Sequence, residues 1–231
     1  MVENNLFARS RYGTHLMYSH HNILRGNRYL SNTVGVFIMY SRHVELAHNV
    51  IAGSAGSAGM GIGMKESGNL EVHDNVLVHN TKGMAIETSP MQDTDTVTIE
   101  RNEIRLAATA IGFHGTPHRL TFKDNLLADN SEQVTLDGGH DAMGTTWTQN
   151  FFDDYQGYDL DGDGFGDVPH AFRSLSSDFI SKRANVAYFR GTVALGVVDV
   201  VGKAFPILDT KTLLVDQRPR MQRQEVLAHA Y

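Results

Sequence analysis

The stretch Val44-Glu-Leu-Ala-His-Asn49-Val-Ile51 decides the fold, because its pattern returns along most of the 231-residue chain. Apolar side chains stand five and three residues before the asparagine and again two residues after it. A closely similar frame surrounds seven asparagines, which are Asn5, Asn27, Asn49, Asn75, Asn102, Asn125 and Asn150. Successive asparagines are 22, 22, 26, 27, 23 and 25 residues apart (27−5, 49−27, 75−49, 102−75, 125−102 and 150−125). A repeat of this length is typical of a solenoid, whose stacked coils share one core.

The apolar positions of the frame predict short strands. The position two residues after each asparagine is filled by Phe7, Tyr29, Ile51, Leu77, Ile104, Leu127 and Phe152. The position three residues before is filled by Leu24, Leu46, Val72, Ile99, Phe122 and Trp147. Apolar residues that alternate with polar ones have the period of a strand with one buried face. We therefore expect an all-β fold, a right-handed parallel β-helix over residues 1–152, followed by a C-terminal helix and an extended tail.

The recurrent asparagine has a structural explanation. Asparagine tolerates the left-handed backbone conformation and bonds to nearby backbone groups, so it suits a corner between two strands. Amide side chains stacked from coil to coil can also form a hydrogen-bonded ladder. We expect these residues to build the fold rather than a binding site.

Composition sets looser bounds on the class of protein. The formal charge is −6 and the isoelectric point is near 6.0, which argues against a nucleic-acid partner. The chain has no cysteine, so disulfides and thiolate metal sites are excluded.

Residues 2–7 already follow the repeat, whereas a solenoid needs a terminal cap. We expect N-terminal coils, and any export signal, to be missing from this sequence.

The pattern changes after Asn150. Residues 153–183 form a loop region rich in Asp and Gly, and residues 184–231 are expected to form a helix and a docking arm. The helix is indicated by apolar residues three or four apart, namely Val186, Phe189, Val193, Val197, Val200 and Ala204. Its apolar part is shorter than the roughly 20 residues that cross a bilayer.

Four aspartates in the loop region suggest calcium binding. Asp159, Asp161, Asp163 and Asp167 occupy the positions that hold ligands in an EF-hand loop, and Gly164 occupies the position of its sharp turn. The bidentate glutamate that ends such a loop is replaced by His170, so a further ligand would have to come from Asp153 or Asp154. The alternative is a turn that the aspartates stabilise through backbone hydrogen bonds.

Methionine and histidine suggest a second metal. Stacking the first coils by 22 residues puts Met17 over Met39 and His21 over His43. His15, His20, His48, Met60 and Met64 lie close by in the repeat. Thioethers suit Cu(I) and imidazoles suit copper generally, so this stripe is a candidate path for copper in transit. The alternative is that methionine fills gaps in the core and that the histidines are ordinary surface residues.

No catalytic constellation is recognisable. Acidic residues such as Glu66, Glu87, Asp93 and Asp95 could line a groove for sugars, which leaves a polysaccharide-active β-helix, a lyase or epimerase, as the alternative function.

The order of the C-terminal segments carries a family resemblance. Asn150-Phe-Phe-Asp-Asp-Tyr155 is followed by Asp159-Leu-Asp-Gly-Asp-Gly-Phe-Gly-Asp167, by the apolar stripe and by Leu214-Val-Asp-Gln-Arg-Pro-Arg-Met221. Together with the repeats, these segments resemble the C-terminal part of the NosD family, accessory proteins in the maturation of nitrous oxide reductase. The resemblance implies a non-catalytic periplasmic β-helix that helps to build the reductase's copper site. It implies three partners: the permease of an ABC transporter, a copper chaperone and nitrous oxide reductase.

Overall fold

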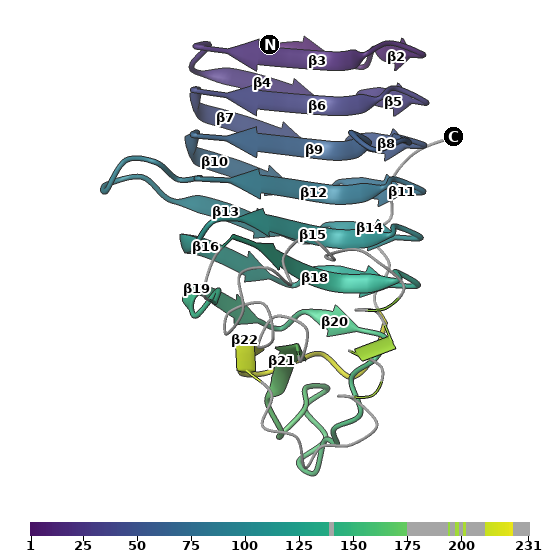
Figure 1. Cartoon of the computed structure of the whole chain (residues 1–231), viewed down its shortest axis with the longest axis vertical. Helices are drawn as coiled ribbons and strands as arrows, with labels where there is room; N and C mark the ends of the chain where they lie inside the picture. Colours follow the sequence, from purple (N-terminus) through teal and green to yellow (C-terminus); the bar gives the residue numbers. More distant parts are fainter. Residues whose placement is uncertain (139–140, 175–193, 195–196, 199–200, 202–210, 224–231) are drawn as a thin grey trace.

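The chain forms a parallel β-solenoid in a computed structural model that describes residues 1–138, 141–174, 194, 197–198, 201 and 211–223. Each coil adds one strand to each of three sheets, and six complete coils are followed by the first strands of a seventh (Figure 1). All pairings between coils are parallel. The all-β solenoid expected from the repeat is confirmed, and its right-handed winding stays a prediction.

The three sheets are named A, B and C in the order in which a coil visits them. Sheet A contains β1 (Val2–Glu3), β4 (Asn22–Arg25), β7 (Arg42–Ala47), β10 (Gly68–His73), β13 (Val97–Glu100), β16 (His118–Lys123) and β19 (Gly144–Thr148). Sheet B contains β2 (Leu6–Ala8), β5 (Arg28–Leu30), β8 (Val50–Ala52), β11 (Val76–Val78), β14 (Glu103–Arg105), β17 (Leu126–Ala128) and β20 (Phe151–Phe152). Sheet C contains β3 (Tyr12–Met17), β6 (Val34–Met39), β9 (Met60–Lys65), β12 (Lys82–Glu87), β15 (Thr109–His114) and β18 (Glu132–Asp137).

The apolar frame of the repeat forms the core. Leu46 and Ile51, which flank Asn49 in the sequence, are fully buried, and their equivalents in neighbouring coils are buried with them. The equivalents pair in register, so that Leu46 lies between Leu24 and Val72. Each such side chain contributes roughly 1.5–3 kcal/mol through the apolar surface that it removes from water. The core is therefore a continuous column along the solenoid.

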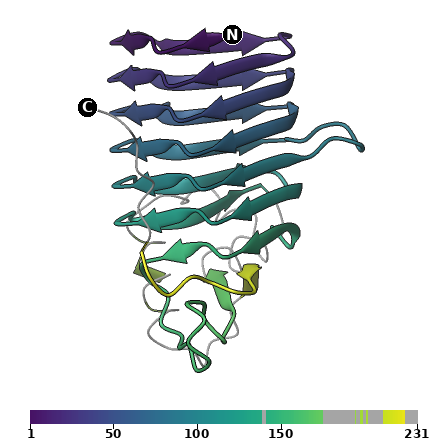
Figure 2. The same ribbon diagram turned by 180° about the vertical axis from the view of Figure 1, so that it is seen from behind.

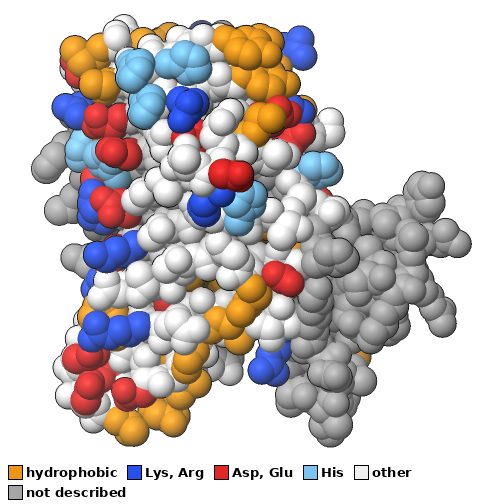
Figure 3. Space-filling view, turned by 90° about the vertical axis from the view of Figure 1, so that its left-hand side faces the viewer, with side chains coloured by type: hydrophobic (Ala, Val, Ile, Leu, Met, Phe, Trp, Pro, Cys, Tyr) orange, Lys and Arg blue, Asp and Glu red, His pale blue; other side chains and the backbone are white. Residues whose placement is uncertain are grey.

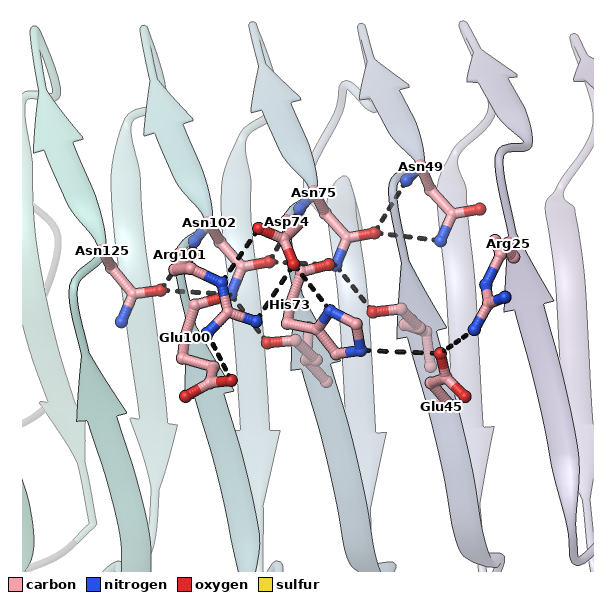
Figure 4. Close-up of polar contacts among 12 residues, drawn as sticks. Arg25, Glu45, Asn49, His73, Asp74, Asn75, Glu100, Arg101, Asn102 and Asn125 are labelled. Atoms are coloured by element: carbon pink, nitrogen blue, oxygen red, sulfur yellow. Dashed lines mark hydrogen bonds and ion pairs between the residues drawn. The ribbon is translucent and has the colours of Figure 1, made fainter. Parts of the chain in front are cut away.

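The recurrent asparagines form the expected ladder. The Asn49 backbone N and Nδ2 both donate to Asn75 Oδ1, each at 2.9 Å. Asn75 repeats this toward Asn102 at 3.1 and 2.9 Å, and Asn102 repeats it toward Asn125 at 3.0 and 3.1 Å (Figure 4). The side chains are buried from Asn27 onward. The ladder thus satisfies polar groups that no water can reach.

The left-handed residue at this corner is not the asparagine but the residue before it. Positive φ angles are found at His48 (55°), Asp74 (55°) and Arg101 (51°), each of which precedes a ladder asparagine. The expectation that asparagine itself supplies the left-handed bend was wrong. Asparagine is needed here for its amide, which accepts and donates at once.

The other two corners have ladders of their own. Between sheets C and A, the Ser41 backbone N donates to Ser67 Oγ at 3.1 Å, and the Ser67 N donates to Ser89 Oγ at 3.0 Å. Between sheets B and C, the Ser54 N donates to Asn80 Oδ1 at 2.9 Å. At these corners, successive coils are therefore tied through side chains as well as through the strands.

The end of the chain closes the last coil. β22 (Lys211–Asp216) pairs in parallel with β19 through Trp147 and Asp216, and β21 (His170–Ser174) lies antiparallel to β22. Figures 1 and 2 show this segment beneath the seventh coil. Leu214 is fully buried, so the docking arm expected over 184–231 is, in its described part 211–223, a cap on the solenoid. The sequence alone missed this because the segment has no counterpart in the repeat.

The helix expected from Val186 to Ala204 lies almost wholly outside the described residues. Positions 194, 197, 198 and 201 are helical, but they are too few to define an element, so the helix stays a prediction. Among the described residues, no helix is long and apolar enough to cross a membrane.

Candidate metal sites

Methionine and histidine side chains meet on the outer face of sheet C. Met17 pairs with Met39 in register, as the 22-residue step predicts, and Met17 is 52% exposed. His15 Nε2 lies 3.3 Å from Met39 Sδ. Two thioethers and an imidazole thus come together from adjacent strands, and we call His15, Met17 and Met39 the copper patch after the copper hypothesis drawn from the sequence. Figure 3 shows hydrophobic and histidine side chains together at the end of the solenoid built from the first coils.

Aromatic neighbours hold His15 in place. Its ring stacks on Tyr12 at 4.9 Å and on Phe37 at 5.6 Å between centroids. A ring packed on both neighbours has few alternative orientations, so its Nε2 is directed toward Met39 before any ion arrives. Sequence reasoning placed His15 near the stripe but did not single it out.

His21 and His43 do not converge on one ion. Their rings stack with centroids 4.7 Å apart and planes only 3° from parallel. A ring nitrogen binds a metal in the plane of its ring, at about 2.0–2.1 Å for an ion such as Zn²⁺. Two parallel planes this far apart share no such point. The sequence prediction correctly stacked these residues, but their stacking opposes joint coordination.

A second group of side chains of the metal-ligand type lies at the corner between sheets A and B. His48, His73 and Asp74 each offer one ligand atom, and these atoms all lie within 4.8 Å of one another. His73 Nδ1 is 2.8 Å from Asp74 Oδ2, and His73 Nε2 is 3.5 Å from Glu45 Oε1 (Figure 4). The rings of His48 and His73 meet edge to face at 85°. We call His48, His73 and Asp74 the corner cluster.

Arginines hold the acidic residues around the corner cluster. Arg25 bonds Glu45 Oε1 at 2.5 Å and holds the pKa of that carboxyl below its usual value. Burial raises the pKa of Asp74, but hydrogen bonds from Arg101 and His73 outweigh it, so that pKa is lowered overall. Arg101 reaches Asp74 Oδ1 at 3.0 Å and Oδ2 at 3.1 Å. Sequence reasoning missed this cluster, because it needs the 26-residue step from His48 to Asp74 (74−48) rather than the 22-residue step.

A comparison with models of known protein families identifies the family of this chain. Residues 1–157 match the family NosD, described as periplasmic copper-binding protein. The chain belongs to the NosD family. No curated protein matches it. Membership makes it a periplasmic, copper-related accessory protein, and the NosD family is not known for catalysis.

The aspartate loop lies beyond the part of the chain that matches NosD. Asp159, Asp161 and Asp163 have ligand atoms within 4.8 Å of one another. Their oxygens accept backbone N–H bonds of the loop, as when Asp159 binds Gly162 N at 2.7 Å and Gly164 N at 2.9 Å. Asp163 also bonds the Arg218 guanidinium. These contacts are those of a turn that its own side chains stabilise.

The remaining calcium candidates lie elsewhere. Asp167 Oδ2 accepts from Leu160 N at 2.6 Å and is not part of the three-aspartate group. Asp153 accepts from Asp129 N at 2.6 Å, and Asp154 pairs with His170 at 3.3 Å. The NosD match supports copper and gives no support to calcium, which stays a prediction for this loop.

The acids expected to line a sugar groove do not gather as a catalytic pair. Asp95 is 1% exposed and bonds Arg42 and Asn69, and Glu87 pairs with Lys65 at 2.5 Å. Glu66 and Asp95 do border one cleft of about 240 Å³, but Asp95 is already held by its partners. Of these acids, Asp95 and Glu87 are therefore each engaged by a cationic partner.

Proposed function

We propose that this NosD-family chain holds Cu(I) in transit at the copper patch, for assembly of the copper site of nitrous oxide reductase. The observation that carries the proposal is the approach of His15 Nε2 to Met39 Sδ at 3.3 Å. Met17 lies beside Met39 on the adjacent strand, so a second thioether is within reach. The donor set fits the metal that the family name implies, because thioether and imidazole are both copper ligands.

The chemistry of the patch suits a cargo ion more than a resident one. All three ligands are neutral, so they favour a soft monovalent ion and add no charge that would trap it. Met17 is half exposed and has a flexible side chain, so a partner protein can approach the ion directly. The sheet fixes the positions of the ligands, and the open face leaves room for exchange.

Three partners complete the proposal, and they rest on the family resemblance. A copper chaperone supplies the ion, nitrous oxide reductase receives it, and the permease of an ABC transporter holds the assembly at the membrane. Since residues 211–223 cap the solenoid, we no longer assign transporter docking to that part of the tail.

The Met17→Leu/Met39→Leu variant is expected to bind Cu(I) roughly tenfold more weakly, or worse, because it loses both sulfur ligands. Leucine keeps nearly the same volume, so the fold is retained. Anaerobic titration against a coloured Cu(I) chelator measures the affinity. Met91→Leu is the matched control, because Met91 is 54% exposed and lies outside the patch.

Two results would contradict the copper-patch proposal. One is an unchanged Cu(I) affinity in the double variant, and the other is an equal loss in the Met91 control. The cellular counterpart is the copper content of nitrous oxide reductase purified from cells that carry the double variant as their only copy. We expect that content to fall, and full copper loading would contradict the role in assembly.

The calcium hypothesis for the aspartate loop has its own test. Ca²⁺ is expected to raise the melting temperature, because an ion that binds only the folded state stabilises it. Asp161→Ala is expected to abolish the rise, because it removes a carboxylate from the three-aspartate group. A melt that is indifferent to both Ca²⁺ and a chelator would leave the loop as a self-stabilised turn.

A further inference from the structure

The corner cluster lies on a different side of the solenoid from the copper patch and contains no sulfur. We propose that His48, His73 and Asp74 bind a divalent transition-metal ion, with Cu²⁺ or Zn²⁺ as its occupant. This inference goes beyond the proposed function, because it concerns a second site with another ligand chemistry. It rests on three ligand atoms within 4.8 Å of one another on adjacent coils.

The solenoid itself brings these residues together. His48 and Asp74 hold the same left-handed position on successive coils, each with a φ of 55°. The His48 backbone N donates to the His73 carbonyl oxygen at 3.3 Å, and β7 pairs with β10 along its length. The coil-to-coil distance in a parallel sheet is about 4.8 Å, which is the scale of the ligand spacing. The site therefore needs only side-chain adjustments, and its backbone is already in place.

The ligand types select the class of metal. Imidazole and carboxylate suit borderline divalent ions, whereas Cu(I) prefers thioether. The rings of His48 and His73 meet edge to face, unlike the parallel rings of His21 and His43, so their planes are able to intersect at one ion. Glu45 Oε1, 3.5 Å from His73 Nε2, is a further carboxylate at the border of the cluster.

The charges around the cluster also favour a cation. Three carboxylates, from Glu45, Asp74 and Glu100, face two guanidiniums, from Arg25 and Arg101, which leaves one net negative charge (3−2). The bound ion would take over the contact between His73 and Asp74, while Arg101 retains Asp74 Oδ1. Arg101 then acts as the partner that orients the ligating carboxylate, a role that such neighbours commonly have.

The test measures binding of Cu²⁺, and separately of Zn²⁺, to the whole chain by equilibrium dialysis, with electron paramagnetic resonance of the Cu²⁺ sample. His48→Asn is the first variant, because asparagine tolerates the left-handed backbone but offers no imidazole. His73→Gln is the second. His43→Asn is the matched control, since His43 has a φ of 56° and lies in the stacked pair.

We expect the parent chain to bind Cu²⁺ with nitrogen couplings from two imidazoles. His48→Asn and His73→Gln should each weaken this binding roughly tenfold or more, and His43→Asn should not. The Met17→Leu/Met39→Leu variant should keep full Cu²⁺ binding, so failure of the copper patch and failure of this site are distinguishable. Absence of Cu²⁺ and Zn²⁺ binding in the parent, or unchanged binding in both cluster variants, overturns the proposal.

Discussion

Replacing Asn102 by leucine is expected to lower the free energy of unfolding by roughly 3–5 kcal/mol, because several buried polar groups lose their partners at once. Asn102 Oδ1 accepts from both the backbone N and Nδ2 of Asn75, and its Nδ2 donates to the Val72 carbonyl at 2.8 Å. Leucine can neither accept nor donate. Asn49→Leu should behave alike, because Asn49 occupies the same place in the ladder. Urea denaturation measures the change.

Asn5 is the matched control for this experiment. Asn5 is exposed, and it donates to Asn27 Oδ1 without a buried environment around it. Water replaces its lost hydrogen bonds, so Asn5→Leu is expected to cost less than about 1 kcal/mol. Equal costs at Asn5 and Asn102, or a neutral Asn102→Leu, would show that the ladder does not stabilise the fold.

Replacing Asp216 by alanine is expected to cost roughly 2–4 kcal/mol, because the last rung of the ladder then has no acceptor. Asp216 is fully buried, and its Oδ2 accepts from Asn150 N at 3.1 Å and from Asn150 Nδ2 at 2.8 Å. Its Oδ1 accepts from Arg218 N at 3.0 Å, so the residue also shapes the cap. A denaturant melt that matches the parent would rule out this role.

The Asp216 carboxyl should also make the stability of the fold depend on pH. Burial raises the pKa of Asp216, although hydrogen bonds from Asn150 and Arg218 oppose the shift. The folded chain therefore keeps this proton to a higher pH than the unfolded chain does. The contribution to stability is fully present below about pH 4, near the unfolded pKa, and is lost as pH rises through the folded pKa.

Asp216→Asn isolates that contribution, because asparagine does not titrate. Other carboxyls, such as Asp74 and Glu45, have lowered pKa values and change stability in the opposite direction, so only the difference between parent and variant is informative. We expect the difference to move in favour of the variant as pH rises from 4 to 7. A constant difference would mean that Asp216 does not titrate in this range.

The repeat was predictable because it depends only on the spacing of apolar residues and asparagines that are close together in the sequence. Apolar residues alternate around each asparagine, and burial of one strand face follows from that alternation. Leu46, Ile51 and Trp147 are buried as the frame requires. The pairing of Met17 with Met39 also follows, because the first two coils are 22 residues apart and contain no insertion.

The rest depended on contacts that no local pattern encodes. Asp216 meets Asn150 across 66 residues, from a segment outside the repeat. The corner cluster depends on the third coil being 26 residues long, which stacks His48 on Asp74. A uniform 22-residue step would instead stack His48 on Leu70. The stacking angle of His21 and His43 is set by packing, and only the structure reveals that it opposes a shared ion.

The asparagine ladder has a polarity. Each backbone N of the series donates to the side-chain oxygen of the next coil toward the C-terminal end, from Asn5 through Asn125 to Asn150, whereas a second hydrogen of each buried amide returns to a carbonyl of the preceding coil. The final acceptor is Asp216, which has no side-chain hydrogen to donate once the pH is above its raised pKa and the carboxyl is ionised. The series of side-chain acceptors therefore ends at Asp216. A further coil stacked beyond an ionised Asp216 would receive no side-chain hydrogen from this residue, so it would lack the amide-to-oxygen contact that joins the other coils.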